Sequence, residues 1–537
     1  MQISIFNHLG KVVGRKLTGS SLINESGRSF VLATEGRLYL VLSHFLQIYG
    51  AKLVSKFIEN VDPITAKTIM EADEKKYKSH ELWVSMAILR ALPGYLKKAP
   101  GVLNARMFPS KAHEQTQEKI ERFKSQIRRI SQSRAPVHVV ANRALECAIN
   151  TLLEATFPVF IASRIALERI KQTVKGAPEE LVRNLELALP YNVTVEMGMS
   201  LYRISQALTD KDLANPPNYD QPIEPQLSPE VALLWKDFLD NYGHRGPGEL
   251  DIAAPRYREE PQMLYEQVLA LKRASKDGVN PLTRYEKNLA LRDEAYEKIC
   301  QLLESEDTNR LRRFQSLYRV WSTLGGYRET HKYLLIFALD AIRTRLLREA
   351  DELVSKGRLD KREQVFDLSL TDLATNLRDR SANLVEIGQN NRKFTDRLAR
   401  VSQLPALIDS RGRILRKKPE QAKEGEITGT AVSQGQVRGR VKVLHSPDEK
   451  PFLHGEILVA RATDPGWTPL FVNAAAVILE VGGMLQHGAL VAREYGLPCV
   501  SGITDATTIF QDGMMVEVDG SNGIVRPLTP VEQGSAV

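Results

Sequence analysis

The chain has 537 residues, of which 43% are hydrophobic and 26% are charged, and its formal net charge is +8. A single hydrophobic core stops growing at about 250–300 residues, so this composition indicates a globular protein of more than one domain. No apolar run approaches the roughly 20 residues that cross a bilayer, and the N-terminus lacks a signal-peptide core, so we expect a cytoplasmic protein with no membrane contact.

Basic residues are in excess, but they are not clustered. Acidic residues lie between them nearly everywhere and no nucleic-acid motif occurs, so we expect no nucleic-acid partner, and an anionic, phosphorylated ligand or an acidic partner instead. The three cysteines, Cys147, Cys300 and Cys499, are far apart, which argues against a disulfide framework and a thiolate metal site. We expect this chain to hold no metal.

The first 390 residues read as a mainly helical domain. Residues 1–39 have short alternating runs and turn glycines, which predict a few strands or extended pieces against the helical body. Long polar-apolar stretches then predict several helices, interrupted by a loop rich in Pro and Asn at 214–229. The helical stretches are 111–207, 231–241, 261–274, 282–304 and 309–356.

A second domain follows a polar segment. Residues 391–426 are polar and basic, with RGRILRKKPEQAKEGE as their clearest part, and predict a linker. Residues 427–530 contain short β-runs at 457–460, 475–481 and 514–518 and few helices, which fits a compact α/β domain; 531–537 form a tail. The expected fold class is therefore multidomain, α followed by α/β.

The helical domain contains one unusual loop and one charged helix start. Residues 241–261 concentrate glycine, proline and charges, as loops that carry sites do. Arg328 and Lys332, in GYRETHKY, lie seven residues before Leu335 and Leu339 on a stripe at helical spacing, so both cations should face inward. Buried cations need anionic partners, which are either Glu249 or Asp251 in a salt-bridge network, or a phosphoryl group.

The C-terminal domain contains the stretch EVGGMLQHGALVAREYGLPCVSG at 480–502. His487 lies between a predicted buried strand at 475–479 and a predicted helix at 489–495, and a helix N-terminus favours a bound anion. Gly482, Gly483 and Gly488 leave room around the imidazole for a phosphate donor or acceptor. The pattern favours a histidine that carries phosphate over a core histidine in a turn.

This stretch, with Thr463-Asp464-Pro465 upstream and Ala492–Pro498 downstream, resembles the swivelling phosphohistidine domain of the phosphoenolpyruvate-utilising enzymes. That family usually has Ser, Thr or Cys before the histidine; Gln486 stands there instead and can donate a hydrogen bond to a phosphoryl oxygen. The resemblance makes His487 the phosphate carrier, supported by Thr463 and the turn glycines.

The loop at 241–261 and GYRETHKY resemble parts of the rifampicin phosphotransferases, and residues 1–62 look like the stretch that follows the ATP-grasp domain there. The resemblance places Arg328 and Lys332 near the transferring phosphate. It leaves Glu249 or Asp251 as a general base. His244, Arg245 and His331 are reserve candidates.

We find no glycine-rich phosphate loop, so the sequence is expected to lack both the ATP-grasp domain and the phosphoenolpyruvate barrel. This division is similar to that of two-component aryl-phosphate synthases. It implies that a separate ATP-grasp protein, holding ATP and Mg²⁺, charges His487, that AMP and phosphate are released, and that the acceptor is a small hydroxylated aromatic compound. The alternatives are a non-catalytic regulatory relative of an antibiotic phosphotransferase and a general protein phosphocarrier.

Overall fold

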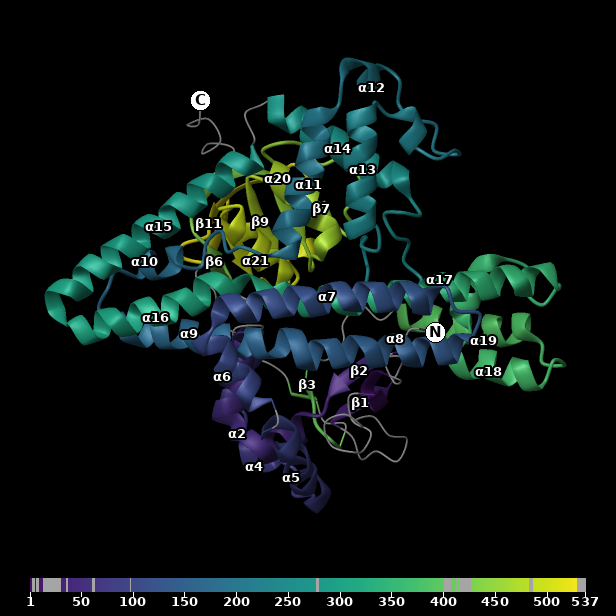
Figure 1. The fold of residues 1–537 in the computed structure, drawn as a ribbon, viewed down its shortest axis with the longest axis horizontal. Coiled ribbons are helices and arrows are strands. Elements are labelled where there is room, and N and C mark those ends of the chain that lie inside the picture. Colours follow the sequence, from purple (N-terminus) through teal and green to yellow (C-terminus); the bar gives the residue numbers. More distant parts are fainter. Residues whose placement is uncertain are drawn as a thin grey trace.

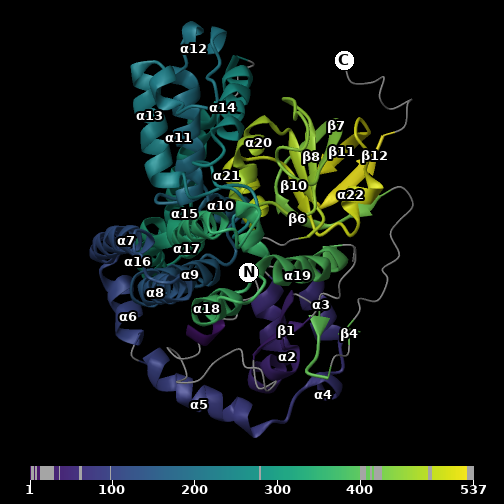
Figure 2. The same ribbon diagram turned by 90° about the vertical axis from the view of Figure 1, so that its right-hand side faces the viewer.

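The computed structural model describes residues 1, 5, 9–12, 30–34, 37–59, 63–96, 98–276, 280–399, 407–411, 414–415, 426–481 and 486–528. Within these residues the chain is mainly helical and ends in a small α/β unit, as the sequence predicts. Figures 1 and 2 show this arrangement from two directions.

Long helices running side by side form the centre of the molecule (Figure 1). α7 (Pro109–Ser131) shows why they pack: Ala112, Ile120, Phe123 and Ile127 recur at spacings of three, four and eight, and all are buried. The other long helices are α8 (Val137–Thr151), α9 (Phe157–Thr173), α15 (Pro281–Glu306), α16 (Thr308–Leu324) and α17 (Thr330–Ser355), with the 3₁₀ turn η3 (Gly325–Glu329) before α17.

One helical stretch differs from the expectation for apolar runs. α8, the π-helical turn η1 (Leu152–Thr156) and α9 form a continuous helix, Val137–Thr173, that is long and apolar enough to cross a membrane by length and composition alone. It packs against α7, α16 and α17 in the helical core, and core helices pass the same test. Polar residues are spaced along this helix, so the sequence shows no continuous apolar run of its length.

Three further helices lie against these long helices and face the C-terminal unit (Figure 2). They are α11 (Val193–Ala207), α13 (Pro229–Tyr242) and α14 (Pro261–Lys276). Asn192 caps α11 by accepting a hydrogen bond from the amide of Thr194 at 3.2 Å. Smaller elements in this part are α10 (Glu179–Asn184), α12 (Asp210–Ala214) and η2 (Glu224–Gln226).

The N-terminal residues and those after α17 form the remaining helical parts. A separate small apolar cluster, with Leu42, Leu46 and Ile69, holds the N-terminal helices together, so 1–390 do not share one core. These elements are β1 (Val31–Thr34), β2 (Arg37–Leu40), α2 (Leu42–Glu59), α3 (Pro63–Glu71), α4 (Glu74–Tyr77), α5 (Leu82–Leu96) and α6 (Ala99–Met107), and later η4 (Arg362–Asp367), α18 (Leu370–Arg378) and α19 (Leu384–Ala399).

The predicted linker is partly structured. Residues 391–399 are the end of α19, and 407–415 contain the paired strands β3 (Leu407–Ile408) and β4 (Ile414–Leu415). The amide of Ser410 donates to Ser43 Oγ at 3.0 Å, and Arg411 bonds the carbonyl of Lys76, so this hairpin is attached to the N-terminal helices. The polar composition concealed these contacts, and residues 400–406, 412–413 and 416–425 lie outside the described residues.

The C-terminal unit is built on an eight-stranded sheet in the order β5-β12-β11-β7-β8-β9-β10-β6. The central neighbours β7 to β10 are parallel, and the outer pairs are antiparallel. The strands are β5 (Ile427–Thr428), β6 (Thr430–Ser433), β7 (Gln436–Leu444), β8 (Ile457–Ala460), β9 (Ala476–Leu479), β10 (Cys499–Ser501), β11 (Met515–Asp519) and β12 (Ile524–Pro527), with η5 (Pro465–Trp467), α20 (Thr468–Asn473), α21 (His487–Glu494) and α22 (Ala506–Ile509).

The C-terminal unit and the helices α11, α13 and α14 share one apolar cluster. Met197 and Leu201 of α11 and Trp235 of α13 belong to the same buried cluster as Phe471 and Tyr495 of the C-terminal unit. Apolar burial therefore stabilises this docked arrangement. The docking positions the N-terminus of α21 against η3.

Candidate active site

His487 is the first residue of α21, with Gln486 as the residue before the helix. Thr463 and Asp464 follow β8, next to β9 in the parallel part of the sheet, so the site lies beyond the carboxyl ends of parallel strands, where ligands of α/β sheets bind. A Cβ atom at Gly488 would overlap Thr463 Oγ1, so this close approach requires glycine. Gly482 and Gly483 lie outside the described residues.

The imidazole of His487 faces a carboxylate from the helical body. Its Nδ1 lies 3.9 Å from Glu329 Oε2, and the two side chains are 7% and 13% exposed. Burial and Lys332 lower the pKa of His487 from its ordinary value, although Glu329 opposes them, so the ring is neutral at pH 7. Burial alone would raise the pKa of Glu329, yet His487, Arg328 and Lys332 lower it to about 2.

This pair fixes which ring nitrogen can react. Since Glu329 is ionised, its negative charge favours the tautomer that carries the proton on Nδ1 of His487. Nε2 then keeps the lone pair. Neither ring nitrogen has a hydrogen-bond partner among the described residues, and both are buried in this arrangement. A neutral imidazole with its proton on Nδ1 has the chemistry of a nucleophile at Nε2.

A buried ion-pair network lies beside this pair. Arg245 Nε donates to Glu249 Oε2 at 2.5 Å and Arg245 Nη2 to Oε1 at 3.1 Å, while Lys332 Nζ lies 3.3 Å from the same Oε1. Arg245 and Glu249 are fully buried, and Lys332 is 22% exposed. Burial would raise the pKa of Glu249, but Arg245 and Lys332 lower it, so Glu249 is held as an ion. This placement favours a role in positioning Lys332 over the predicted role as a base.

Asp464 joins the C-terminal unit to the loop of the helical body. Its Oδ2 accepts a hydrogen bond from the amide of Gly248 at 2.7 Å, and its Oδ1 accepts one from the amide of Gly466 at 2.9 Å. A Cβ at Gly466 would lie 2.7 Å from Cα of Pro247, so the two backbones touch here. Burial and the nearby Glu249 raise the pKa of Asp464, whereas the pKa of Glu249 is lowered. Asp464 is therefore a better proton acceptor than Glu249.

Arg328 does not lie on α17 as the spacing predicts. It belongs to the 3₁₀ turn η3, and α17 begins at Thr330, so the helical stripe ends before Arg328. Lys332 is in the first turn of α17, as expected. Arg328 helps to lower the pKa of the buried Glu186 against the effect of burial, together with Lys171 and Arg493. Arg328 thus interacts electrostatically with Glu329 and with a second acidic side chain, Glu186.

The remaining candidates separate into one site neighbour and three residues elsewhere. Arg245 is part of the site network. His244 is fully buried between the rings of Tyr333 and Phe337, and burial holds its pKa well below its ordinary value, as for a core histidine. His331 faces Phe160, with 6.0 Å between ring centroids. Asp251 is exposed and accepts from the amide of Ala253 at 2.9 Å, so it caps a turn and is not part of the site.

Two site residues were missing from the sequence prediction. Glu329 lies between the two predicted cations in GYRETHKY, and Asp464 lies in the Thr-Asp-Pro triplet used to recognise the domain. Both stood in quoted motifs, but only the fold shows that Glu329 faces His487 and that Asp464 lies close enough to affect its pKa. Among the residues the structure describes, no group of three or more His, Cys, Asp or Glu side chains could hold a metal ion.

Two families of known proteins match parts of this chain. Residues 452–523 match the family described as PEP-utilising enzyme, mobile domain, and 151–329 match the rifampicin phosphotransferase fourth domain. Rifampicin phosphotransferases from a Streptomyces species and from Bacillus cereus are 34% and 30% identical over 359 and 368 residues, each covering 64% of this chain and 41% of the relative. An uncharacterized phosphotransferase of Bacillus subtilis, YvkC, is 28% identical over 299 residues, 53% of this chain and 35% of its own length.

The predicted relationship is therefore confirmed: the chain carries both domains and is similar to rifampicin phosphotransferases. It spans about two fifths of the length of the rifampicin phosphotransferases it matches. The matched fourth domain ends at 329, the position of the carboxylate that faces His487, and the matched mobile domain contains His487 itself. The site thus forms where the two matched regions meet.

Proposed function

We propose that this chain is the phosphotransfer component of a split kinase. His487 receives a phosphoryl group from ATP, which a separate ATP-grasp protein holds with Mg²⁺. It passes this group to the hydroxyl of a small aromatic acceptor, and AMP and phosphate are the co-products. The observation that supports this best is His487 buried against Glu329 and Lys332 at the docking surface. The relatives named phosphotransferases give the reaction class.

In the first half-reaction, Nε2 of neutral His487 attacks a phosphorus of ATP. Because AMP and inorganic phosphate are the co-products, Nε2 attacks the β-phosphorus and AMP leaves, which puts a pyrophosphoryl group on the histidine. Water then attacks the γ-phosphorus, phosphate leaves, and the β-phosphoryl group stays on Nε2. The low pKa of His487 keeps the attacking lone pair available at neutral pH. The C-terminal unit then takes up the docked arrangement, in which His487 lies beside Glu329.

In the second half-reaction, the bond between Nε2 and phosphorus breaks while the acceptor oxygen forms a new bond to phosphorus. The electron pair returns to Nε2, and the proton on Nδ1, stabilised by Glu329, lets the ring leave as neutral imidazole. Lys332 and Arg328 stabilise the charge on the phosphoryl oxygens. Asp464, whose pKa burial raises, takes the hydroxyl proton.

The test is labelling with ATP radioactive at the β or the γ position, in the presence of Mg²⁺ and a candidate ATP-grasp protein. The β label should stay on the chain as acid-labile phosphate, and His487→Ala should remove it. Hydroxylated aromatics are then screened for release of the label as product. A charged chain that transfers phosphate only to another protein would support a general phosphocarrier, and a chain never labelled would support a regulatory relative.

A further inference from the structure

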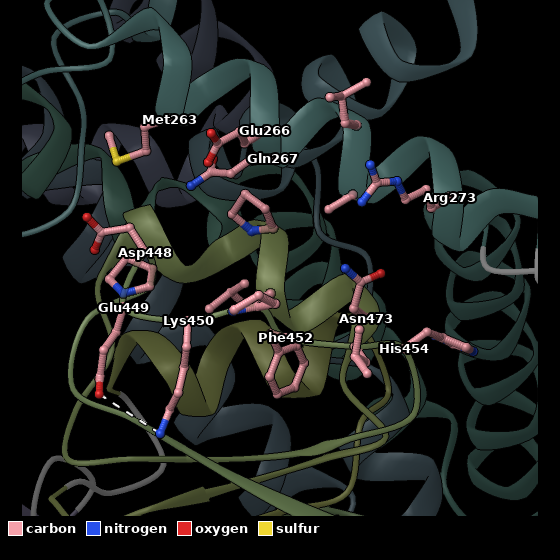
Figure 3. Close-up of a pocket in the computed structure, with 17 residues that line it drawn as sticks. Met263, Glu266, Gln267, Arg273, Asp448, Glu449, Lys450, Phe452, His454 and Asn473 are labelled. Atoms are coloured by element: carbon pink, nitrogen blue, oxygen red, sulfur yellow. Dashed lines mark ion pairs between the residues drawn. The ribbon is translucent and has the colours of Figure 1, made fainter. Parts of the chain in front are cut away.

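Two cavities interrupt the docking surface between the helical body and the C-terminal unit. One, of about 560 Å³, separates α14 from residues 447–454 and α20 (Figure 3). The other, of about 410 Å³, lies between residues 171–186 of the helical body and a wall formed by β6, α21 and residues 520–521. Apolar burial has no preferred direction, so the shared apolar cluster stabilises docking without fixing how α21 is oriented. The orientation of α21 therefore depends on polar contacts across the surface.

One such contact joins Glu186 to Arg493. Glu186 lies in the loop between α10 and α11, and Arg493 lies in the last turn of α21. Arg493 Nη1 is 3.8 Å from Glu186 Oε2, and the two side chains are 13% and 12% exposed. Within its own unit, Arg493 Nη2 donates to the carbonyl of Val432 at 3.2 Å. The guanidinium group thus bonds its own sheet and faces a carboxylate of the other domain.

Glu186 pairs with cations of both domains. Its Oε1 is 2.9 Å from Lys171 Nζ on α9, so each carboxylate oxygen faces a different cation. Burial would raise the pKa of Glu186, but Lys171, Arg493 and Arg328 lower it, so the carboxylate is ionised. Lys171 belongs to the same domain as Glu186. The pair with Arg493 is the one that forms on docking.

The loop that carries Glu186 is held in place by the helical body. Trp321 Nε1 donates to the carbonyl of Leu185 at 2.9 Å. Ala188 and Tyr191 have φ angles of 43° and 63°, in the left-handed region that non-glycine residues adopt mainly where their surroundings hold them. The carboxylate therefore projects from a backbone of fixed shape.

The same loop packs on η3, the turn that carries Glu329. A Cβ atom at Gly326 would overlap the carbonyl oxygen of Pro190, so the two backbones touch. Residues 185–191 therefore contact η3 through one end and α21 through the other. They set the position of the C-terminal end of α21 relative to the turn that carries Glu329.

We propose that Glu186 is a positioning residue for phosphoryl transfer and acts through Arg493. Their ion pair fixes the orientation of α21 that brings His487 against Glu329. His487 is the first residue of α21 and Arg493 the seventh, so the two contacts lie about 9 Å apart along the helix. Two contacts at this separation define the direction of the helix, which one contact cannot do. The effect on transfer rests on the proposed function, whereas the effect on the ring needs neither ATP nor a partner.

The first test reads the ring of His487 by ¹⁵N NMR of the full chain. The wild type should carry its proton on Nδ1 above pH 7, and His487→Gln identifies the signal by its loss. In Arg493→Gln the ring should move away from Glu329, and the preference for the Nδ1 proton should be lost. The pKa of His487 should then rise toward its ordinary value, because burial and Lys332 lower it less.

Two further variants separate the ion pair from the bond to Val432. Glu186→Gln leaves that bond intact and should change the ring as Arg493→Gln does. Arg493→Lys keeps a cation that can reach Glu186 and should restore the Nδ1 proton. Arg438→Gln is the matched control, because it breaks an arginine ion pair of 2.7 Å with Glu517 inside the C-terminal unit, and it should change nothing. A wild-type ring in both Arg493→Gln and Glu186→Gln, or the same change in Arg438→Gln, would overturn the inference.

A second measurement separates positioning from the strength of docking. The amide of Gly248 donates to Asp464 across the docking surface, so its hydrogen exchange reports separation of the domains. Apolar burial supplies most of the docking, so Arg493→Gln should speed this exchange by at most about threefold. Release of the β label from His487 to phenol should slow by about tenfold, since a misplacement of about 1 Å can slow a reaction about a hundredfold. Slowing no greater than the rise in exchange would assign Arg493 to docking alone, and the inference would be wrong.

The inference and the proposed function fail separately. A wild type that never carries the β label would contradict the proposed function, and the NMR spectra of the variants would still decide whether Glu186 positions the ring. A wild type that carries and transfers the label, with the same His487 tautomer in every variant, would contradict the inference alone.

Discussion

Under the proposed function, replacing Glu329 with Gln tests how the helical body acts on the ring of phosphorylated His487. The substitution keeps the shape of the side chain and removes the charge that lies 3.9 Å from Nδ1 of His487. With the proton on Nδ1 no longer stabilised, the ring becomes a poorer leaving group, and the second half-reaction should slow. Charging of His487 by the partner takes place away from Glu329 and should not change.

The size of the effect follows from the geometry and the pKa. A ring phosphorylated on Nε2 that keeps the proton on Nδ1 is a cation, and two unit charges 3.9 Å apart interact by roughly 4 kcal/mol at an effective dielectric constant of about 20. His487, Arg328 and Lys332 together lower the pKa of Glu329 to about 2 against the effect of burial, so the ring supplies only part of the stabilisation of this carboxylate. Assigning about 2 kcal/mol to the ring gives a slowing of about 30-fold.

The assay is a single turnover. The chain is charged with the β label, freed of ATP and mixed with acceptor, and loss of label from His487 is followed in time. Glu329→Asp, which keeps the charge but shortens the side chain, is the control and should retain more activity than Glu329→Gln. A transfer rate within about threefold of the wild type for Glu329→Gln would refute the assigned role.

Three further predictions concern docking, stability and pH. Gly466→Ala places a methyl group 2.7 Å from Cα of Pro247, so it should weaken docking of the C-terminal unit by about 1–3 kcal/mol. Hydrogen exchange of the Gly248 amide should then be faster, and unchanged exchange would contradict the contact. Glu249→Gln leaves Arg245 buried without its ionic partner and should lower the free energy of unfolding by about 3–5 kcal/mol in urea melts, against almost no change for the exposed Glu230→Gln. Burial lowers the pKa of His487, so its contribution to the free energy of unfolding is present above about pH 6.5 and is lost as the pH falls below that value. His487→Gln should flatten this part of the plot of unfolding free energy against pH. An NMR titration of His487 with a midpoint at or above about 6.5 would contradict the prediction. The lowered pKa of Glu329 acts at lower pH, because its contribution is present above about 4.5 and is lost toward 2.

The sequence predicted the parts of this molecule that depend on local pattern. The helices around 111–207 and 309–356, the α/β unit after 427 and the strand-turn-helix at His487 follow from hydrophobic periodicity and turn residues. Lys332 was predicted to face either a carboxylate such as Glu249 or Asp251 or a phosphoryl group, and in the structure it pairs with Glu249. These features needed only the order of residues along the chain.

The rest depended on contacts between distant segments. Arg328 leaves the helical face because the chain tightens into a 3₁₀ turn before α17, a change that spacing does not reveal. Glu329 meets His487, and Asp464 meets Gly248, only because the C-terminal unit docks on α11, α13 and α14. Asp251 looked as suitable as Glu249 in sequence, but its neighbour Ala253 holds it in a surface turn.

The attachment of the β3–β4 hairpin limits how far the C-terminal unit can move from the N-terminal helices. Because the backbone of Ser410 is bonded to Ser43, the chain is anchored up to Leu415, and the sheet of the C-terminal unit starts again near Glu426. The chain between them spans at most about 40 Å when fully extended. Under the proposed function, a partner that charges His487 would have to hold its ATP within this distance of the hairpin, plus the length of the C-terminal unit itself. The N-terminal helices that hold the hairpin would then determine where such a partner binds.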